Sequence, residues 1–192
     1  MCTFTQEEQN YLLAVAREAI TEALEECASG DAGCQRPAPE GSALAQCLGV
    51  FVTLHKGKAL RGCIGRMSAA EPLTATVRTM AREAAFRDPR FPPLTLEELA
   101  RCSLEISVLS PFKLCADPDS VVVGLHGLYL VHQGRSGVLL PQVPLEQGWD
   151  RTAYLDYLCI KASLPPHSYR APGAKLYTFT AVVFSEPPGA VA

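Results

Sequence analysis

The sequence predicts an α+β fold with mainly antiparallel sheet and flanking helices, and three observations support this class. Short β-branched, apolar segments are joined by turn residues, which is typical of antiparallel pairs. Helical patterns separate groups of such segments instead of alternating with single strands. Apolar residues make up 48% of the 192 residues, a normal share for a globular protein that excludes a disordered chain.

The helices are predicted from capping residues and apolar spacing. Thr5 and Glu8 have the spacing of a capping box, and apolar side chains then recur at helical intervals as far as Cys27. Residues 28–42 are rich in Gly, Pro and Ala, so we interpret them as a loop or linker. A second helix is predicted over residues 72–86, because proline is favoured in a first turn.

A hairpin follows the linker. Residues 47–54 and 59–64 read as two strands, with Lys56-Gly57 at the centre of the tight turn between them. This places Cys63 near the exit of the hairpin, where a side chain can face a cleft.

The rest of the chain mixes connectors, strands and one more helix. Residues 88–93 contain three prolines and predict an extended connector, which an Asp88–Arg90 ion pair would lock. Further elements are a short helical turn at 95–99, strands at 103–109, 121–133, 138–140 and 175–184, and a helix at 151–162. We expect one domain over residues 1–192, with its core at about 7–184 and a smaller lobe around residues 40–85 inserted in a larger one.

The charge of the chain argues against a nucleic-acid partner, and its hydropathy argues against a membrane span. The net charge is -3, the isoelectric point is near 5.8, and no run of basic residues occurs, so we expect no nucleic-acid partner. No apolar run is long enough to span a bilayer and no signal peptide is read, so we expect a cytoplasmic protein whose thiols stay reduced.

Eight cysteines are present, and no two have C-x-x-C spacing. A zinc ribbon or a thioredoxin-like motif is therefore unsupported, and most of the thiols are expected to be small buried hydrophobes. No cluster of histidines and carboxylates has metal-binding spacing, so we expect no metal and no cofactor.

The hexapeptide at residues 60–65, LRGCIG, is the strongest candidate site. Gly62 and Gly65 let the backbone come close to something small, and the neighbouring arginines favour the reactive thiolate of Cys63. Arg61 can instead hold the carboxylate or phosphate of a substrate. The alternative is that Cys63 only fills space, since free cysteines are often buried.

Other candidate residues come from charge and position. His126, which stands between two glycines, is the histidine that best suits a general base, and it can equally be an exposed turn residue. Glu105 lies in the middle of an apolar strand, so it is either functional or paired with an arginine such as Arg61 or Arg90. Gln142 and Lys161 can contact a ligand, or they can cap a turn and a helix end.

Several ordered segments, taken together with the hexapeptide, resemble a known family. The segments are residues 49–54, 84–95, 105–111, 124–128, 137–143 and 149–150. They are similar to the AMMECR domain family, and within it to the form called AmmeMemoRadiSam system protein A, over about residues 7–184. The resemblance implies an α+β domain of two intimate lobes around a cleft, with the hexapeptide at or near that cleft. It also implies a Memo-like protein and a radical SAM protein as partners. Ser163 departs from the family pattern, which tends to have glycine there, so the resemblance implies a changed backbone after the last helix.

Three functions remain open at this point. The first is a Cys-dependent transferase or hydrolase for a small anionic or carbonyl substrate, with Cys63 as nucleophile and His126 or Glu105 moving protons. The second is a non-catalytic binding or scaffold module of the same system. The third is a nucleic-acid-associated regulatory protein, which the acidic charge disfavours. We expect Cys63, Glu105 and residues 124–142 to line one cleft.

Overall fold

The computed structural model describes residues 3–29 and 43–186, and the chain divides into two compact units. The larger unit comprises the described residues up to Leu109 together with residues 182–186, and the smaller unit comprises residues 110–181. From the sequence alone, we expect a smaller lobe around residues 40–85. Those residues, where described, instead share a hydrophobic core with the first helix and the third strand.

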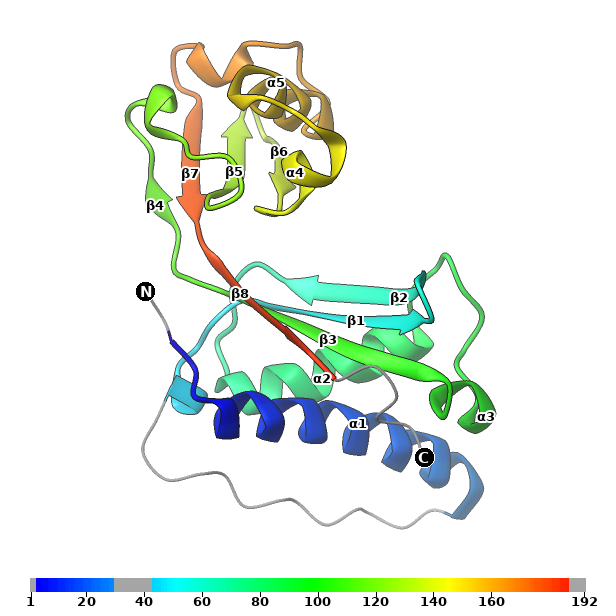
Figure 1. The fold of residues 1–192 in the computed structure, drawn as a ribbon. Coiled ribbons are helices and arrows are strands. Elements are labelled where there is room, and N and C mark those ends of the chain that lie inside the picture. The colour runs from blue at the N-terminus through cyan, green and yellow to red at the C-terminus, as the bar shows by residue number, and fades with distance from the viewer. Residues whose placement is uncertain (1–2, 30–42, 187–192) are drawn as a thin grey trace. The chain divides into compact units, whose positions relative to one another are not determined.

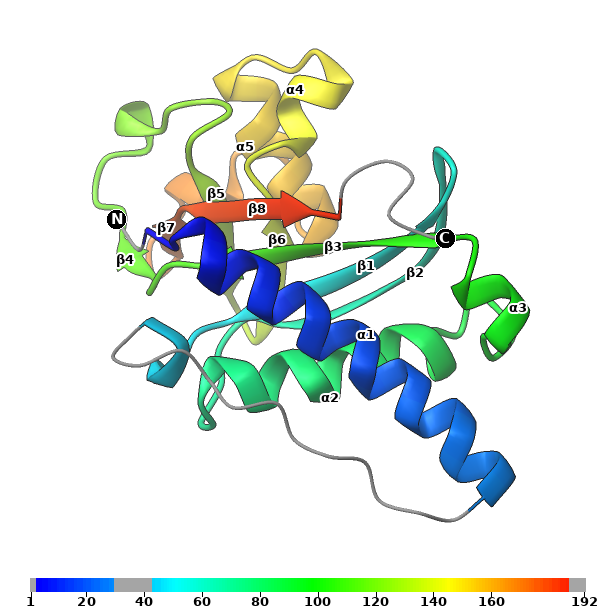
Figure 2. The same cartoon turned by 60° about the horizontal axis from the view of Figure 1, so that its bottom comes forward.

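A four-stranded sheet with the order β2-β1-β3-β8 forms the larger unit. Helices α1 and α2 cover one face of it, as Figures 1 and 2 show. The apolar alternate positions of the strands, such as Val52, Leu54 and Ile106, belong to the core on this face. The elements are α1 (Gln6–Ser29), β1 (Val50–Lys56), β2 (Ala59–Arg66), α2 (Leu73–Phe86), α3 (Leu96–Leu99), β3 (Cys102–Leu109) and β8 (Ala181–Ser185).

We call the opposite side of this sheet the second face. It carries the other alternate side chains of the strands, and these are more polar than those of the core. They are Phe51, Thr53 and His55 on β1, Cys63 and Gly65 on β2, and Ser103, Glu105 and Ser107 on β3.

The predicted hairpin is present, with its turn one residue later than expected. Gly57 and Lys58 form the two-residue loop, and Gly57 has a φ of 63°, which suits the first position of a type II′ turn. The register then shifts, because Leu54 faces Gly62 whereas His55 faces Leu60. Arg61 is therefore an extra residue on β2, which is a β-bulge.

The first residues of the helices agree with the predicted capping. Thr5 and Glu8 form the expected capping box, since the Glu8 backbone N–H donates to Thr5 Oγ1 at 3.2 Å and the Thr5 N–H donates to Glu8 Oε2 at 2.8 Å. Pro72 stands at the N-cap of α2, and Thr95 caps the short helix α3 by accepting from the Glu98 N–H. Of the predicted linker at 28–42, residues 30–42 lie outside the described residues.

The smaller unit is a four-stranded sheet with the order β4-β7-β5-β6, and α5 packs on β5 and β6. Its core includes Leu128, Tyr154 and Leu158. The strand predicted over residues 175–184 is two strands, β7 and β8, which belong to different sheets. The elements of the smaller unit are β4 (Lys113–Leu114), β5 (Gly127–His132), β6 (Arg135–Leu139), α4 (Val143–Gln147), α5 (Arg151–Lys161) and β7 (Lys175–Phe179).

Candidate functional site

Three side chains of different chemistry form one row across the second face. Thr53 is the cross-strand partner of Cys63 on β2 and of Glu105 on β3. Successive strand residues point to opposite faces, so all three side chains lie on the same side of the sheet. Cys63 and Glu105 thus share one sheet face, with an unanticipated hydroxyl between them, and the cleft they are expected to line with residues 124–142 stays a prediction.

The thiol and the hydroxyl are in direct contact. Thr53 Oγ1 donates to Cys63 Sγ at 3.2 Å. The backbone N–H of Cys63 points away from β1, so the two residues form a non-hydrogen-bonded pair, in which side chains come closest, with Cα atoms about 4.5 Å apart.

A carboxylate and a guanidinium fix the backbone of Cys63 at the free edge of β2. Asp88 Oδ2 accepts the Cys63 N–H at 2.8 Å, and Arg90 Nη2 donates to the Cys63 carbonyl at 3.2 Å. Arg90 also binds Asp88 through Nε at 2.9 Å and Nη2 at 2.6 Å, which is the predicted ion pair. The pair therefore takes the place of a neighbouring strand at this one residue.

The Asp88 carboxyl is held in its charged form. Its side chain is only 2% exposed. The hydrogen bond from Arg90 holds the pKa of Asp88 well below its usual range, and the N–H groups of Cys63 and Arg90 act in the same direction against the opposing effect of burial.

The Arg61 guanidinium binds other groups of the protein. It donates to Glu98 through Nε at 3.3 Å and Nη2 at 2.8 Å, and Nη2 also reaches the Pro92 carbonyl at 2.9 Å. Hydrogen bonding from Arg61 lowers the pKa of Glu98 to about 2, with a smaller contribution from Lys56. Arg61, which is 7% exposed, thus holds the bulge to α3.

The aromatic ring of Phe91 lies close to the guanidinium groups of both Arg61 and Arg90. The guanidinium carbons of Arg61 and Arg90 lie 5.7 and 5.5 Å from the ring centroid, within the range of cation–π contacts. The connector at 88–93 is thereby attached to the edge of β2 through both arginines and Asp88.

The space left by the two glycines of the hexapeptide is occupied by other atoms of the protein. A Cβ on Gly62 would lie 2.3 Å from the Ala84 carbonyl oxygen, so this glycine lets α2 pack on β2. A Cβ on Gly65 would lie 2.3 Å from the ring of Phe51, so this glycine leaves space for that ring on the second face. Their predicted contact with a ligand stays a prediction.

Glu105 differs from Asp88 and Glu98, each of which is paired with an arginine. Among the described residues no hydrogen bond or ion pair to its carboxylate is found, since Arg61 binds Glu98 and Arg90 binds Asp88. His55 was predicted in the turn but lies on β1, opposite Leu60 and Ser103, and is a diagonal neighbour of Glu105 on the second face.

The other predicted site residues, His126, Gln142 and Lys161, belong to the smaller unit. His126 Nδ1 accepts the Val122 N–H at 3.1 Å. Gln142 stands at the N-cap of α4 without a side-chain capping bond, and Lys161 is the last residue of α5. Their part in a Cys63 site, and the cleft they were expected to line, stay predictions.

Thr53 and His55 are the residues that sequence reasoning missed. Period-2 alternation of β1 puts both on one face, and this signal was available. The cross-strand partners of these residues could not be predicted from the sequence. The bulge at Arg61 shifts the register, so that Thr53 pairs with Cys63 instead of Gly62.

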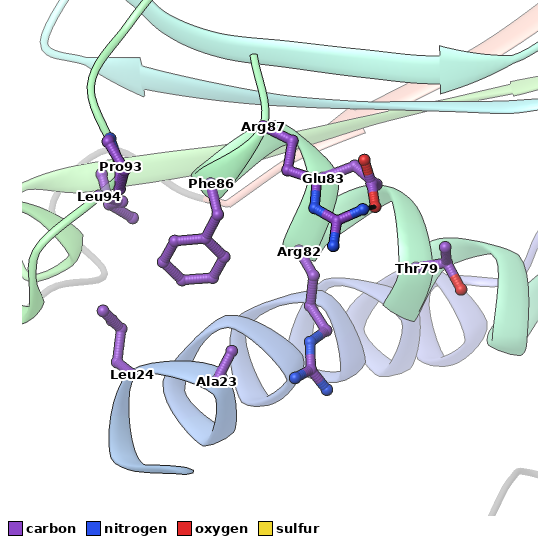
Figure 3. A pocket seen from close by; sticks show the side chains of 9 residues that line it. All are labelled: Ala23, Leu24, Thr79, Arg82, Glu83, Phe86, Arg87, Pro93 and Leu94. Carbon is purple, nitrogen blue, oxygen red and sulfur yellow. Dashed lines mark ion pairs between the residues drawn. The ribbon is translucent and has the colours of Figure 1, made fainter. Parts of the chain in front are cut away.

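A groove of about 830 Å³ lies in the larger unit between α1, α2 and the connector, as shown in Figure 3. Phe86 and Leu24 contribute apolar surface, and Glu83 on its rim is paired with Arg87 at 3.2 Å. The groove holds no cysteine or histidine, so we place the candidate chemistry on the second face. The lining residues are Ala23, Leu24, Thr79, Arg82, Glu83, Phe86, Arg87, Pro93 and Leu94.

Two kinds of feature are absent from residues 3–29 and 43–186. No helix there combines the length and the hydropathy needed to cross a membrane. No group of three or more His, Cys, Asp or Glu side chains in that part is arranged to hold a metal ion.

These features define an α+β protein with a thiol, a hydroxyl and a carboxylate in register on one sheet face. Residues 13–184 match the family model AMMECR1, and the chain belongs to this family.

The relatives and a solved structure agree with this membership. A protein of Methanopyrus kandleri is 41% identical over 191 residues, covering 95% of this chain and 90% of the relative. One from Methanocaldococcus jannaschii is 44% identical over 146 residues, covering 72% and 73%. The crystal structure of an uncharacterised protein from Pyrococcus horikoshii matches with a TM-score of 0.83 at 38% identity, covering 95% of this chain and 93% of the other. The predicted fold class is confirmed.

Proposed function

We propose that the second face is a Cys-centred site at which the Cys63 thiolate attacks a carbonyl carbon of a small substrate. The observation that carries the proposal is the hydrogen bond from Thr53 to Cys63 Sγ, in one row with Glu105, whose carboxylate has no partner among the described residues. Nucleophilic catalysis needs a thiol with a proton-handling group nearby, and the second face supplies both kinds of group in Cys63 and His55.

In the proposed step the sulfur forms a bond to the carbonyl carbon, and the bond from that carbon to the leaving group breaks. His55, a diagonal neighbour of Cys63 on the second face, takes the thiol proton and returns it to the leaving group, whereas Glu105 stands two strands away from Cys63. Water, or an acceptor in a transferase, then cleaves the thioester and frees Cys63.

The contacts favour a carbonyl substrate over an anionic one. An anion would need a free guanidinium, whereas Nε and Nη2 of Arg61 and Arg90 already bind Glu98, Pro92, Asp88 and the Cys63 carbonyl. A carbonyl carbon needs only the nucleophile and groups that move protons.

Acyl transfer from p-nitrophenyl acetate tests the proposal. We expect a burst of about one p-nitrophenolate per chain, which Cys63→Ser abolishes and Cys47→Ser retains, because Cys47 is exposed and lies outside the row. A burst of unchanged size and rate in Cys63→Ser contradicts the proposal.

A non-catalytic binding module is the second candidate, and the fixed backbone of Cys63 favours it. Asp88, Arg90 and Arg61 rigidify the edge of β2, which also suits a surface that holds a ligand without reacting. Under this function the Cys63→Ser variant shows no change in the burst and retains ligand binding.

The partners and the compartment are proposals as well. Family membership motivates a Memo-like protein and a radical SAM protein as partners, and co-purification of the tagged proteins from one cell tests this. A free thiol at the centre of the site suits the reducing cytoplasm, where we place the protein.

A further inference from the structure

We infer that the ligand of the second face carries a protonated amine, which Glu105 binds, at some distance from the carbonyl that faces Cys63. The inference rests on the proposed function for the identity of Cys63 as the reacting group. It adds a binding role for Glu105 and a charge for the substrate.

Among residues 3–29 and 43–186, charge pairing near the hairpin leaves the Glu105 carboxylate without a counter-charge. Asp88 pairs with Arg90, and Glu98 pairs with Arg61, so both arginines are neutralised by a carboxylate of their own. Lys56 lies 3.6 Å from Glu98 and alternates with His55, so it belongs to the helix-covered side.

The other polar groups on β1 and β3 of the second face are the hydroxyls of Thr53, Ser103 and Ser107 and the His55 ring. Ser107 faces Phe51 across β1, two positions along β3 from Glu105. A partly buried carboxylate without a counter-charge attracts a cation and repels an anion.

The spacing sets the size of the ligand. Cys63 and Glu105 are separated by two strand spacings, or about 10 Å between backbones. Thr53 lies under the middle of this span, and the Phe51 ring lies beside it over Gly65. A compound whose amine and carbonyl lie several bonds apart spans the row.

Charged thiol reagents measure the field at Cys63 without knowledge of the substrate. The probes are methanethiosulfonates with an ethyltrimethylammonium or an ethylsulfonate group. The thiolate attacks the sulfenyl sulfur, a mixed disulfide forms, and methanesulfinate leaves. Peptide mass spectrometry gives the rate at each cysteine, and exposed Cys47 is the internal reference.

We expect the cation-to-anion rate ratio at Cys63 to exceed that at Cys47 about fivefold at low salt, and to fall several-fold at 0.5 M salt. Glu105→Gln should bring the ratio at Cys63 close to that at Cys47. Glu97→Gln is the matched control, because Glu97 is exposed and paired with Arg101 on α3, and it should leave the ratio unchanged.

Each outcome decides between the two claims. A ratio at Cys63 equal to that at Cys47, or one that persists in Glu105→Gln, overturns the amine inference while the burst from p-nitrophenyl acetate still supports a nucleophilic Cys63. Failure of Cys63 to react with either reagent overturns both. If Glu105→Gln does not fold, the salt dependence in the unmodified protein decides.

Discussion

At the residue scale, Cys63 is defined by the groups that hold its backbone and its sulfur. Its N–H and carbonyl are bound by Asp88 and Arg90, and its Sγ accepts from Thr53. The thiols of Cys102 and Cys159 differ, because both are buried and burial raises their pKa. The sequence identified Cys63 and Glu105 from glycines, arginines and an acid within an apolar strand. It could not identify the Asp88 contact with Cys63, because that contact depends on how the connector folds back on β2.

Removing the charge of Asp88 should lower stability in a pH-dependent way. Asp88→Asn loses charge-assisted bonds to Arg90 and to the Cys63 N–H, for about 2 kcal/mol at pH 7. The folded-state pKa of Asp88 is depressed, so its contribution is present above the ordinary carboxyl value of about 4 and is lost as the pH falls below it.

Urea titrations at several pH values check this. The difference between the original protein and Asp88→Asn should be largest above about pH 5 and should shrink towards pH 2. A difference that is constant over this range means that the charge of Asp88 does not stabilise the fold. Asp117→Asn serves as the control, since Asp117 is in the other unit and caps a short 3-10 helix.

At the element scale, the bulge on β2 decides which residues face outward. A two-residue turn at Gly57-Lys58 without a bulge would place Cys63 opposite Val52 and turn it towards the helices. Arg61 takes up one residue, so Cys63 faces Thr53 instead. Sequence periodicity predicted the hairpin and not the bulge, because the bulge is held by Glu98 and Pro92, more than thirty residues away.

Replacing the guanidinium at the bulge should weaken it. Arg61→Lys keeps the charge and loses the two-nitrogen contact with Glu98, so we expect a loss of about 1–3 kcal/mol in urea unfolding. Arg101→Lys, in an exposed pair on α3, should change stability by less than about 0.5 kcal/mol. Equal effects of the two substitutions would show that Arg61 does not hold the bulge.

The end of α5 carries a backbone conformation that favours glycine. Ser163 has a φ of 58°, so the predicted departure from the family leaves the left-handed geometry in place with a side chain on it. Ser163→Gly should raise stability by about 0.5–1 kcal/mol, because a left-handed L-residue costs about 1–2 kcal/mol and glycine has more freedom when unfolded. The neighbouring Ala162, with a φ of -81°, is the control, and Ala162→Gly should lower the melting temperature.

At the scale of the whole molecule, the chain forms two units joined through residues near Leu109 and Ala181. The sequence predicted the fold class and the family, since strands, turns and ordered motifs are local signals. It missed the boundary of the inserted unit, because alternation continues from β7 into β8 through Thr180 and resembles one strand. The strand predicted from residue 121 begins only at Gly127, since the preceding residues form a loop in which Val122 binds His126.

The acidic balance of the chain gives a further prediction. With a net charge of -3, the protein should show no submicromolar, salt-dependent binding to duplex DNA or to single-stranded RNA in 150 mM salt. Fluorescence anisotropy with labelled oligonucleotides checks this. Binding that weakens steeply with salt would point to a basic surface formed by residues scattered in the sequence.

The account depends on the Thr53 hydroxyl making Cys63 a reactive thiol, and site-resolved alkylation tests this most directly. Iodoacetamide at pH 7.5, followed by peptide mass spectrometry, gives a rate for each cysteine. Cys63 should react well ahead of buried Cys102 and Cys159. A hydrogen bond is worth about 0.5–1.5 kcal/mol, and the lower part of this range corresponds to about threefold in rate.

Thr53→Val should therefore slow Cys63 about threefold, with Cys47 unchanged as the internal reference. Thr79→Val is the matched control, since the Thr79 hydroxyl binds only a carbonyl of its own helix, and it should leave every rate unchanged. If Cys63 reacts as slowly as the buried cysteines, or reacts equally fast in Thr53→Val, the row on the second face is not the reactive site.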